Sequence, residues 1–278
     1  MQTVTGRINE IKQPSGGYVK PRSLLRIKYD DGKTLNDNEN IPPQLIGIIV
    51  DYLTRYMLTE DVYESFDISY RGSKIATSYM LSRMKKGEIP YDFEKADQYG
   101  FGKALYLIDG IQGLDDESIK RACKVVTYDT WYRNPSGAIT SAGPEEINPN
   151  RETIENIRIM VKRGLSFLEE NGPVVEAGVT FPKCSFTDMI CNADADYLTN
   201  DTIWDFKVIK SEPSSKHTLE LLMYWLLGQH SGKEELERIR NLGIYNPRKN
   251  IAYSINICLI PKAFIEQVSE DVMGYAKY

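Results

Sequence analysis

Hydrophobic residues recur at helical spacing through the first half of the chain. In "PQLIGIIVDYLTRYML" (43–58) and "DDESIKRACKVV" (115–126), apolar residues return every three or four positions, which predicts helices. Pro42 and Pro43 suit a first helical turn, where a missing N–H group costs little. Asp115 or Asp116 can cap the second of these helices. We expect further helices between residues 60 and 133.

Two segments mark the end of this helical half. "NPSGAITSAGPEEINPN" (134–150) is rich in Pro, Gly, Ser and Asn, which indicates a loop or a domain boundary. "RETIENIRIMVKRGLSFLEENG" (151–172) then predicts a long helix that ends at Gly172. Near the N-terminus, "SLLRIKYDDGKTL" (23–35) predicts a short hairpin with its turn at "DDG".

The pattern changes after residue 172. Four short segments rich in β-branched and aromatic residues predict strands: "PVVEAGVTF" (173–181), "FTDMICNADADYL" (186–198), "TIWDFKVIK" (202–210) and "IAYSINICLI" (251–260). A helix, "SKHTLELLMYWLLGQH" (215–230), separates the last two. From residue 151 the order is helix, three strands, helix, strand, which indicates an α+β or α/β-like core with mixed strand pairing.

This change suggests a division of the chain at residue 150. We expect residues 1–150 to form a mostly helical N-terminal region that packs on the core or contributes a helix to it. Residues 151–278 are expected to form the core itself. At 278 residues, the chain is long enough for one large domain or two small ones.

Composition narrows the functional classes. Charged residues make up 26% of the chain and the net charge is -5, which argues against coating by nucleic acid through bulk charge but allows local basic patches. The four cysteines show no CxxC spacing, so we expect reduced core residues of a cytoplasmic protein. No signal peptide or membrane span is expected. With two histidines, catalysis would rest on carboxylates and lysine.

Three acids and a lysine gather around one predicted turn. Asn200 and Asp201 suit a two-residue hairpin loop. Thr199 then pairs with Thr202, which places Asp196 opposite Asp205 and Asp194 opposite Lys207. Because strand side chains alternate, these four charged side chains project from one face. The other face is a packing surface of Ala193, Ala195, Tyr197, Trp204, Phe206 and Val208.

Two carboxylates opposite each other in a hairpin repel, so they require a shared proton or a cation. Oxygen ligands suit Mg²⁺ or Mn²⁺ better than zinc. Lys207 would place an ammonium group beside that ion, where it can orient water or stabilise charge on a phosphate. The alternative is a solvated strand face with a surface salt bridge. The apolar neighbours of Asp205 favour a buried strand, in which charges seldom lack a role.

These residues resemble the PD-(D/E)xK nuclease superfamily, with its restriction-endonuclease-like core, and its RecB-type branch in particular. That branch has G-x-x-D on the second strand, [DE]-x-K on the third and Q-x-x-x-Y on the following helix. The matching run here is "ADADYL…IWDFKVIK…HTLELLMYWLLG". The resemblance covers residues 173–260.

The resemblance implies roles for individual residues. Asp196 and Asp205 would be the strand acids and Lys207 the catalytic lysine, while Glu220 and Tyr224 occupy the Gln and Tyr positions. The implied metal ligands are Asp196, Asp205 and the backbone carbonyl of Phe206. The implied chemistry is phosphodiester hydrolysis by a water activated by Mg²⁺ or Mn²⁺.

The chain departs from the family pattern in three places. Ala193 replaces the glycine of G-x-x-D, Glu220 replaces glutamine, and no H-x-x-x-E motif supplies the acid that the family has on its first core helix. Asp51, Glu155 and Glu176 are candidates for that acid. Asp194 is a further candidate metal ligand.

Basic residues outside the hairpin are candidates for nucleic-acid contacts. Arg248 and Lys249 lie in a predicted turn between two strands, and Lys210 follows the acidic hairpin. Arg71 and Lys74 belong to a strip of cations interleaved with tyrosines, a pattern that suits single-stranded nucleic acid and also a solvated helix face.

The sequence therefore predicts a cytoplasmic, magnesium-dependent deoxyribonuclease of the RecB-like type, a hydrolase with DNA as its expected partner. The residues do not decide between DNA and RNA, or between exonuclease and endonuclease action. A role in a phage or in defence fits a stand-alone nuclease. The alternative is a non-catalytic module with the same core, which binds nucleic acid or protein as a subunit of a larger assembly or as a homo-oligomer.

Overall fold

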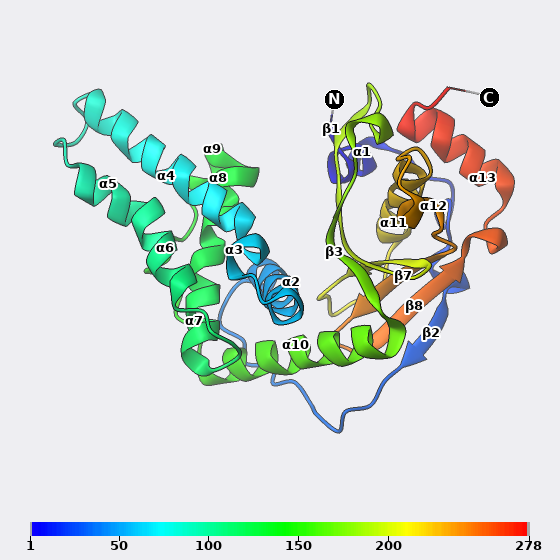
Figure 1. Ribbon diagram of the computed structural model, residues 1–278, viewed down its shortest axis with the longest axis horizontal. Coiled ribbons are helices and arrows are strands. Elements are labelled where there is room, and N and C mark those ends of the chain that lie inside the picture. The colour runs from blue at the N-terminus through cyan, green and yellow to red at the C-terminus, as the bar shows by residue number, and fades with distance from the viewer. Residues whose placement is uncertain (1, 277–278) are drawn as a thin grey trace. The chain divides into compact units, whose positions relative to one another are not determined.

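The computed structural model describes residues 2–276, which form two compact units (Figure 1). Unit 1 comprises residues 2–31 and 166–276, and unit 2 comprises residues 32–165. This division differs from the predicted boundary after residue 150. Residues 2–31 belong with the C-terminal half, because their two strands pair with strands of that half.

Unit 1 contains most of the strands. In chain order its elements are β1 (Gln2–Thr3), α1 (Val4–Glu10), β2 (Leu25–Lys28), β3 (Val174–Thr180), β4 (Ile190–Asn192), β5 (Asp194–Thr199), β6 (Thr202–Phe206), α11 (Ser215–Gln229), α12 (Glu234–Glu237), β7 (Asn241–Asn246), β8 (Ile251–Asn256) and α13 (Lys262–Gln267). Short 3-10 segments lie at Pro21–Ser23, Lys183–Ser185 and Ile257–Leu259, and a π-helical segment lies at Val268–Met273.

A six-stranded mixed sheet forms the centre of unit 1, in the order β2-β8-β7-β6-β5-β3. β6 and β7 are parallel, whereas the other neighbours are antiparallel. A parallel pair needs a crossover connection, and α11 lies in the one between β6 and β7. The prediction of an α+β fold with mixed pairing is confirmed. The small parallel sheet β1-β4 is separate.

The hairpin predicted for residues 23–35 is wrong. Its first half is β2, but β2 pairs with β8, and residues 29–35 form no strand. The side chains of Leu25 and Ile27 are 62% and 44% exposed, so this edge strand contributes little apolar burial of its own. The "DDG" turn signal therefore marks the exit from an edge strand and not a hairpin.

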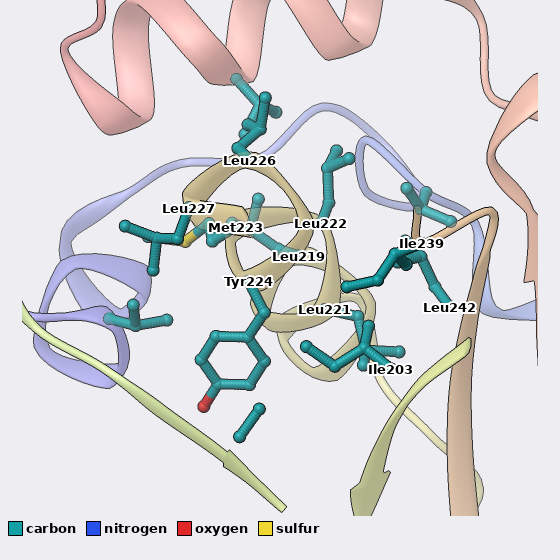
Figure 2. Close-up of a cluster of buried hydrophobic side chains, with 14 of the residues drawn as sticks. Ile203, Leu219, Leu221, Leu222, Met223, Tyr224, Leu226, Leu227, Ile239 and Leu242 are labelled. Atoms are coloured by element: carbon teal, nitrogen blue, oxygen red, sulfur yellow. The ribbon is translucent and has the colours of Figure 1, made fainter. Parts of the chain in front are cut away.

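Each face of the sheet is covered by a helix. Leu219, Leu222 and Leu226 of α11 lie in a buried cluster with Ile203 and Leu242 of the sheet (Figure 2). On the other face, a second cluster joins Phe167 and Leu168, near the end of α10 (Arg151–Asn171), to Tyr197, Trp204, Phe206 and Tyr245. The rings of Phe167 and Tyr245 stack with their centroids 3.9 Å apart. The sheet is thus the middle layer of unit 1.

Unit 2 is helical. Its elements are α2 (Pro43–Thr59), α3 (Val62–Ser65), α4 (Asp67–Lys85), α5 (Phe93–Tyr99), α6 (Phe101–Asp109), α7 (Asp116–Val125), a 3-10 turn (Val126–Tyr128), α8 (Asp129–Arg133) and α9 (Pro135–Ala138). The predicted helices of this region are confirmed. Asp115 is the residue that caps α7, since its Oδ1 accepts the N–H groups of Glu117 and Ser118. The predicted helix end at Gly172 also agrees with α10, whose first part lies in unit 2.

The structure also bears on the expectations about membrane spans and cysteines. Within residues 2–276, no helix is both long enough and apolar enough to cross a membrane. The four cysteines are free thiols, but only Cys123 is buried, while Cys184, Cys191 and Cys258 are exposed. The expectation that the cysteines are core residues is therefore correct for Cys123 alone.

A glycine in β7 makes room for an aromatic side chain of β6. Gly243 pairs with Trp204, and a Cβ atom at residue 243 would lie 2.1 Å from a Trp204 ring carbon. We predict that Gly243→Ala lowers the free energy of unfolding of unit 1 by about 1–3 kcal/mol, because the ring must leave its position against Phe167. Urea denaturation followed by tryptophan fluorescence measures this change.

The matched control is Gly113→Ala, since no atom lies within 4 Å of an added Cβ at that position. The control should unfold at the wild-type urea concentration. An unchanged midpoint for Gly243→Ala would show that the Trp204 ring moves aside without cost.

Candidate active site

The β5–β6 hairpin has the register that its turn residues predict. Tyr197 pairs with Trp204 and Leu198 with Ile203, as expected for a two-residue loop at Asn200 and Asp201. Tyr197, Trp204 and Phe206 lie together on the α10 face, also as predicted. Ala193 and Ala195 do not lie there. They belong to the cluster around α11 instead, so the predicted packing face is wrong for these two residues.

The side chain of Asp196 bonds to β6 beyond the last backbone pair of the β5–β6 ladder. The β5–β6 ladder covers residues 197–198 and 203–204, whereas β6 remains paired to β7 as far as Phe206. The Phe206 N–H group donates to Oδ2 of Asp196 at 2.6 Å. The carboxylate of Asp196 is therefore fixed to the backbone of the segment that carries Asp205 and Lys207.

A glycine of the neighbouring strand lies beside Asp196. Ala177 pairs with Tyr197 and Val179 with Ala195, which places Gly178 opposite Asp196. Gly178 has a φ of 73°, a conformation that residues with side chains rarely adopt. A glycine within an otherwise regular strand marks a local distortion, and here it lies next to the acid.

Lys207 joins the sheet to α11 through two ion pairs. Its Nζ lies 2.9 Å from Oδ1 of Asp205 and 2.9 Å from Oε2 of Glu220. Both acids are buried, with 3% and 8% exposure. Burial by itself would lower the pKa of Lys207, but the charges of Asp205, Glu220 and Asp196 raise it by more, so the net pKa lies above its ordinary value. Lys207 therefore stays protonated at neutral pH.

Tyr224 and Thr5 hold the other oxygen of Glu220. The Tyr224 hydroxyl donates to Oε1 of Glu220 at 3.3 Å, and the Thr5 hydroxyl donates to the same oxygen at 3.4 Å. Figure 2 shows the Tyr224 ring leaving α11 with its hydroxyl directed away from the helix. Burial raises the pKa of Tyr224, and nearby carboxylates raise it further, so the hydroxyl keeps its proton and acts as a donor.

The carboxylates that act on Tyr224 are those of Glu220, Asp205, Asp196 and Asp194. Carboxylates from two strands and one helix therefore lie near enough to raise the pKa of this hydroxyl, and Glu220 is the one that contacts it directly. Lys207 is the cation among them. The structure thus brings together the residues predicted for this site: Asp194, Asp196, Asp205, Lys207, Glu220 and Tyr224.

Two residues at this site were not predicted from the sequence. Thr5 comes from α1, more than 200 positions away, and no sequence pattern connects it to Glu220. His217 lies one helical turn before Glu220, a spacing that could have indicated it. Burial lowers the pKa of His217, as does the charge of Lys207. Its Nδ1 accepts the N–H group of Ser214, so the neutral ring carries its proton on Nε2.

The candidates for a third acid lie elsewhere. Asp51 is in unit 2, on α2, with one oxygen 2.9 Å from Arg55. Glu155 is also in unit 2, on the first part of α10, and pairs with Arg158. Glu176 is on β3, opposite Leu198, and its Oε1 accepts the Thr180 N–H group.

Oxygen donors for a cation are present but few. Asp196 accepts the N–H group of Phe206, which follows Asp205 directly in the chain, and Asp194 is exposed at the start of β5. Within residues 2–276, no group of three or more Asp, Glu, His or Cys side chains has the arrangement of a metal site. Besides the exposed Asp194, the predicted oxygen donors are the half-buried carboxylate of Asp196, the buried carboxylate of Asp205 and the Phe206 carbonyl.

The basic residues predicted to contact nucleic acid are distributed over both units. In unit 1, Lys249 pairs with Glu212 at 2.7 Å, Arg248 lies in the β7–β8 turn and Lys210 is exposed. In unit 2, Arg71 pairs with Asp67, and the Lys74 ammonium lies over the Tyr70 ring, 4.2 Å from its centroid.

Comparisons with known proteins identify no relative. No family model, no curated protein and no solved structure matches this chain. The site must therefore be interpreted from its own residues.

The ion pairs of Lys207 predict a pH-dependent stability in a variant. Lys207→Met leaves the buried carboxylates of Asp205 and Glu220 without their cation, and an uncompensated buried charge is costly unless the group takes up a proton. The folded variant then binds more protons than the unfolded chain, so its stability falls as pH rises. We expect a loss of at most about 3 kcal/mol at pH 8.5 and a smaller loss at pH 5.5, measured by urea denaturation.

In the wild-type protein, the contribution of Lys207 to the free energy of unfolding does not change between pH 5.5 and pH 8.5. A lysine with a raised pKa stabilises fully below its unfolded pKa of about 10.4. Lys249→Met is the matched control, since Glu212 is largely exposed, and it should cost about 1 kcal/mol or less at both pH values. If Lys207→Met lowered the free energy of unfolding equally at both pH values, the result would contradict buried ion pairs between Lys207 and its two acids.

Proposed function

We propose that this chain is a metal-dependent nuclease of the PD-(D/E)xK type, which hydrolyses phosphodiester bonds, with DNA as the substrate. The observation that carries the proposal is the position of the Lys207 ammonium between the carboxylates of Asp205 and Glu220. Asp196 accepts the N–H group of Phe206, the residue between Asp205 and Lys207 in the chain. The order α10, β3, β5, β6, α11, β7 supports it, since it agrees with the restriction-endonuclease-like core that the resemblance implies. The parallel pair β6–β7 within an otherwise antiparallel sheet also fits the central mixed sheet expected of that core.

The charge balance of the site favours a cation. Four carboxylates act on the Tyr224 hydroxyl, whereas Lys207 is the basic residue that is ion-paired among them. Such an excess of partly buried negative charge is reduced when a cation binds, and carboxylate and carbonyl oxygens suit Mg²⁺ or Mn²⁺. Asp196, Asp205 and the Phe206 carbonyl would hold the ion. When bound, it would supply Lewis-acid polarisation of the phosphate and an activated water.

The protein's own residues position the reacting groups. Lys207, kept protonated by its acids, would donate to the attacking water or to a phosphate oxygen. Glu220 is a positioning residue, because it orients Lys207 with Oε2 while Tyr224 and Thr5 hold Oε1. Asp196 orients the backbone between Asp205 and Lys207 through the Phe206 N–H group.

A specific observation favours a second candidate function. Lys207 already supplies a cation to Asp205 and Glu220. Within residues 2–276, no group of three or more His, Cys, Asp or Glu side chains is arranged to hold a metal ion. The same core could then serve as a non-catalytic module that binds nucleic acid or a protein partner. Cleavage separates the two functions.

The test is a cleavage assay on linear duplex, circular duplex and single-stranded DNA and on RNA, with Mg²⁺, with Mn²⁺ and with EDTA. We expect cleavage that requires the metal and that Asp205→Asn reduces by about 100-fold or more. Asp188→Asn is the control, an exposed acid of the same unit outside the cluster, and should cleave as the wild type does. Undiminished cleavage by Asp205→Asn would refute the site, and a folded wild type that binds DNA without cleaving it would favour the second function.

Glu220→Gln tests the positioning role, since it restores the amide that the family has at this position. The variant keeps an oxygen for the Tyr224 hydroxyl but removes one of the charges that raise the pKa of Lys207. That pKa should therefore fall, and the alkaline limb of the pH–rate profile should move to lower pH. The rate loss should be smaller than for Asp205→Asn, and an unchanged profile would argue against coupling between Glu220 and Lys207.

A further inference from the structure

Unit 2 has a basic cleft between α6 and α7. A cavity of about 530 Å³ is lined by Lys103, Tyr106 and Leu107 of α6, by Glu117, Lys120, Arg121 and Lys124 of α7, and by Asn148 and Pro149. We call it the α6–α7 cleft. Four of its side chains are cations and one is an acid, although the chain as a whole has a net charge of -5. The cleft is thus a local reversal of the protein's charge.

Two of these cations form no ion pair. Lys120 and Lys124 are half-buried, and neither lies within ion-pair distance of an acid among residues 2–276, although the charge of Lys124 acts on Glu145. The other two are paired, Arg121 with Glu117 and Lys103 with Glu145. A cleft lined mainly by one sign of charge attracts counter-ions, and a bound anion would offset the repulsion among its cations. This observation indicates an anionic ligand.

An exposed aromatic ring stands in the same cleft. Tyr106 is 62% exposed, and the Arg121 guanidinium lies over its ring, 4.7 Å from the centroid. The Arg121 Nη1 also donates to the Tyr106 carbonyl at 2.9 Å, and the Lys103 ammonium lies 5.9 Å from the ring centroid. These contacts fix the ring while leaving most of it accessible. A fixed, accessible aromatic ring among cations is the combination on which a nucleic-acid base stacks.

We propose that the α6–α7 cleft binds single-stranded nucleic acid. Lys120 and Lys124 contact successive phosphates, and Tyr106 stacks against a base. A single strand is favoured over a duplex, because its bases are free to leave the stack. An acidic peptide would use the lysines but would have no need of Tyr106. The inference shares its partner with the proposed function, but it concerns another unit and requires no cleavage.

The experiment measures binding of the full chain to a fluorescein-labelled (dT)₂₀ strand by anisotropy, in EDTA so that the strand stays intact. We expect Lys120→Gln/Lys124→Gln to weaken binding by about tenfold at low salt and to reduce the slope of log K against log salt by about 1.4, since each lost contact with a single strand contributes about 0.7. Tyr106→Ala should weaken binding by roughly fivefold or more, whereas Tyr106→Phe, which keeps the ring, should bind as the wild type does.

The matched control is Lys86→Gln/Lys95→Gln, which removes two exposed lysines of the same unit and should leave binding almost unchanged. Equal weakening by this control, or wild-type binding by the Lys120 and Lys124 variant, would overturn the proposal. Competition by polyglutamate as strong as by unlabelled (dT)₂₀, together with indifference to Tyr106→Ala, would assign the cleft to an acidic peptide instead. The cleavage assay with Asp205→Asn tests the site in unit 1, and its outcome does not depend on the binding experiment in EDTA. The two proposals can therefore fail independently.

Discussion

The ion pairs of Lys207 with Asp205 and Glu220 are the interaction on which the centre of unit 1 depends. They connect the end of β6 to α11 at a place where both acids are almost fully buried. Apolar packing fixes the rest of that interface, but it cannot compensate two carboxylates. The lysine makes their burial tolerable, and the carboxylates in turn keep the lysine charged. The two carboxylates and the lysine therefore depend on one another to remain charged while buried.

This mutual dependence explains why the site is well positioned without a long network of side chains. Glu220 is held at both oxygens, by Lys207 on one side and by Tyr224 and Thr5 on the other. Asp196 is held by a backbone N–H group rather than by a flexible partner. Groups restrained in this way lose little further entropy when a reaction begins, which is the advantage of a preorganised site. The same restraint would equally fix the side chains of a binding surface.

Several parts of this arrangement followed from local sequence. The register of the β5–β6 hairpin could be counted from Asn200 and Asp201, and the common face of Asp205 and Lys207 followed from strand alternation. The helical spacing of Glu220 and Tyr224 placed them together, as the structure does. Other parts could not be predicted. β2 pairs with β8 and Thr5 reaches Glu220, and both contacts join residues that are distant in the chain.

The sequence by itself determined most of the helices, the β5–β6 hairpin, the mixed α+β character and the set of charged residues around one turn. These features depend on neighbours within about one hairpin or a few helical turns. Only the tertiary structure decided which unit residues 2–31 join, that Ala193 and Ala195 pack towards α11, and that His217 lies near Lys207. It also showed that Asp51 and Glu155 lie in unit 2. The physical reason is that strand pairing and packing between layers are non-local, and local patterns do not specify which partners meet.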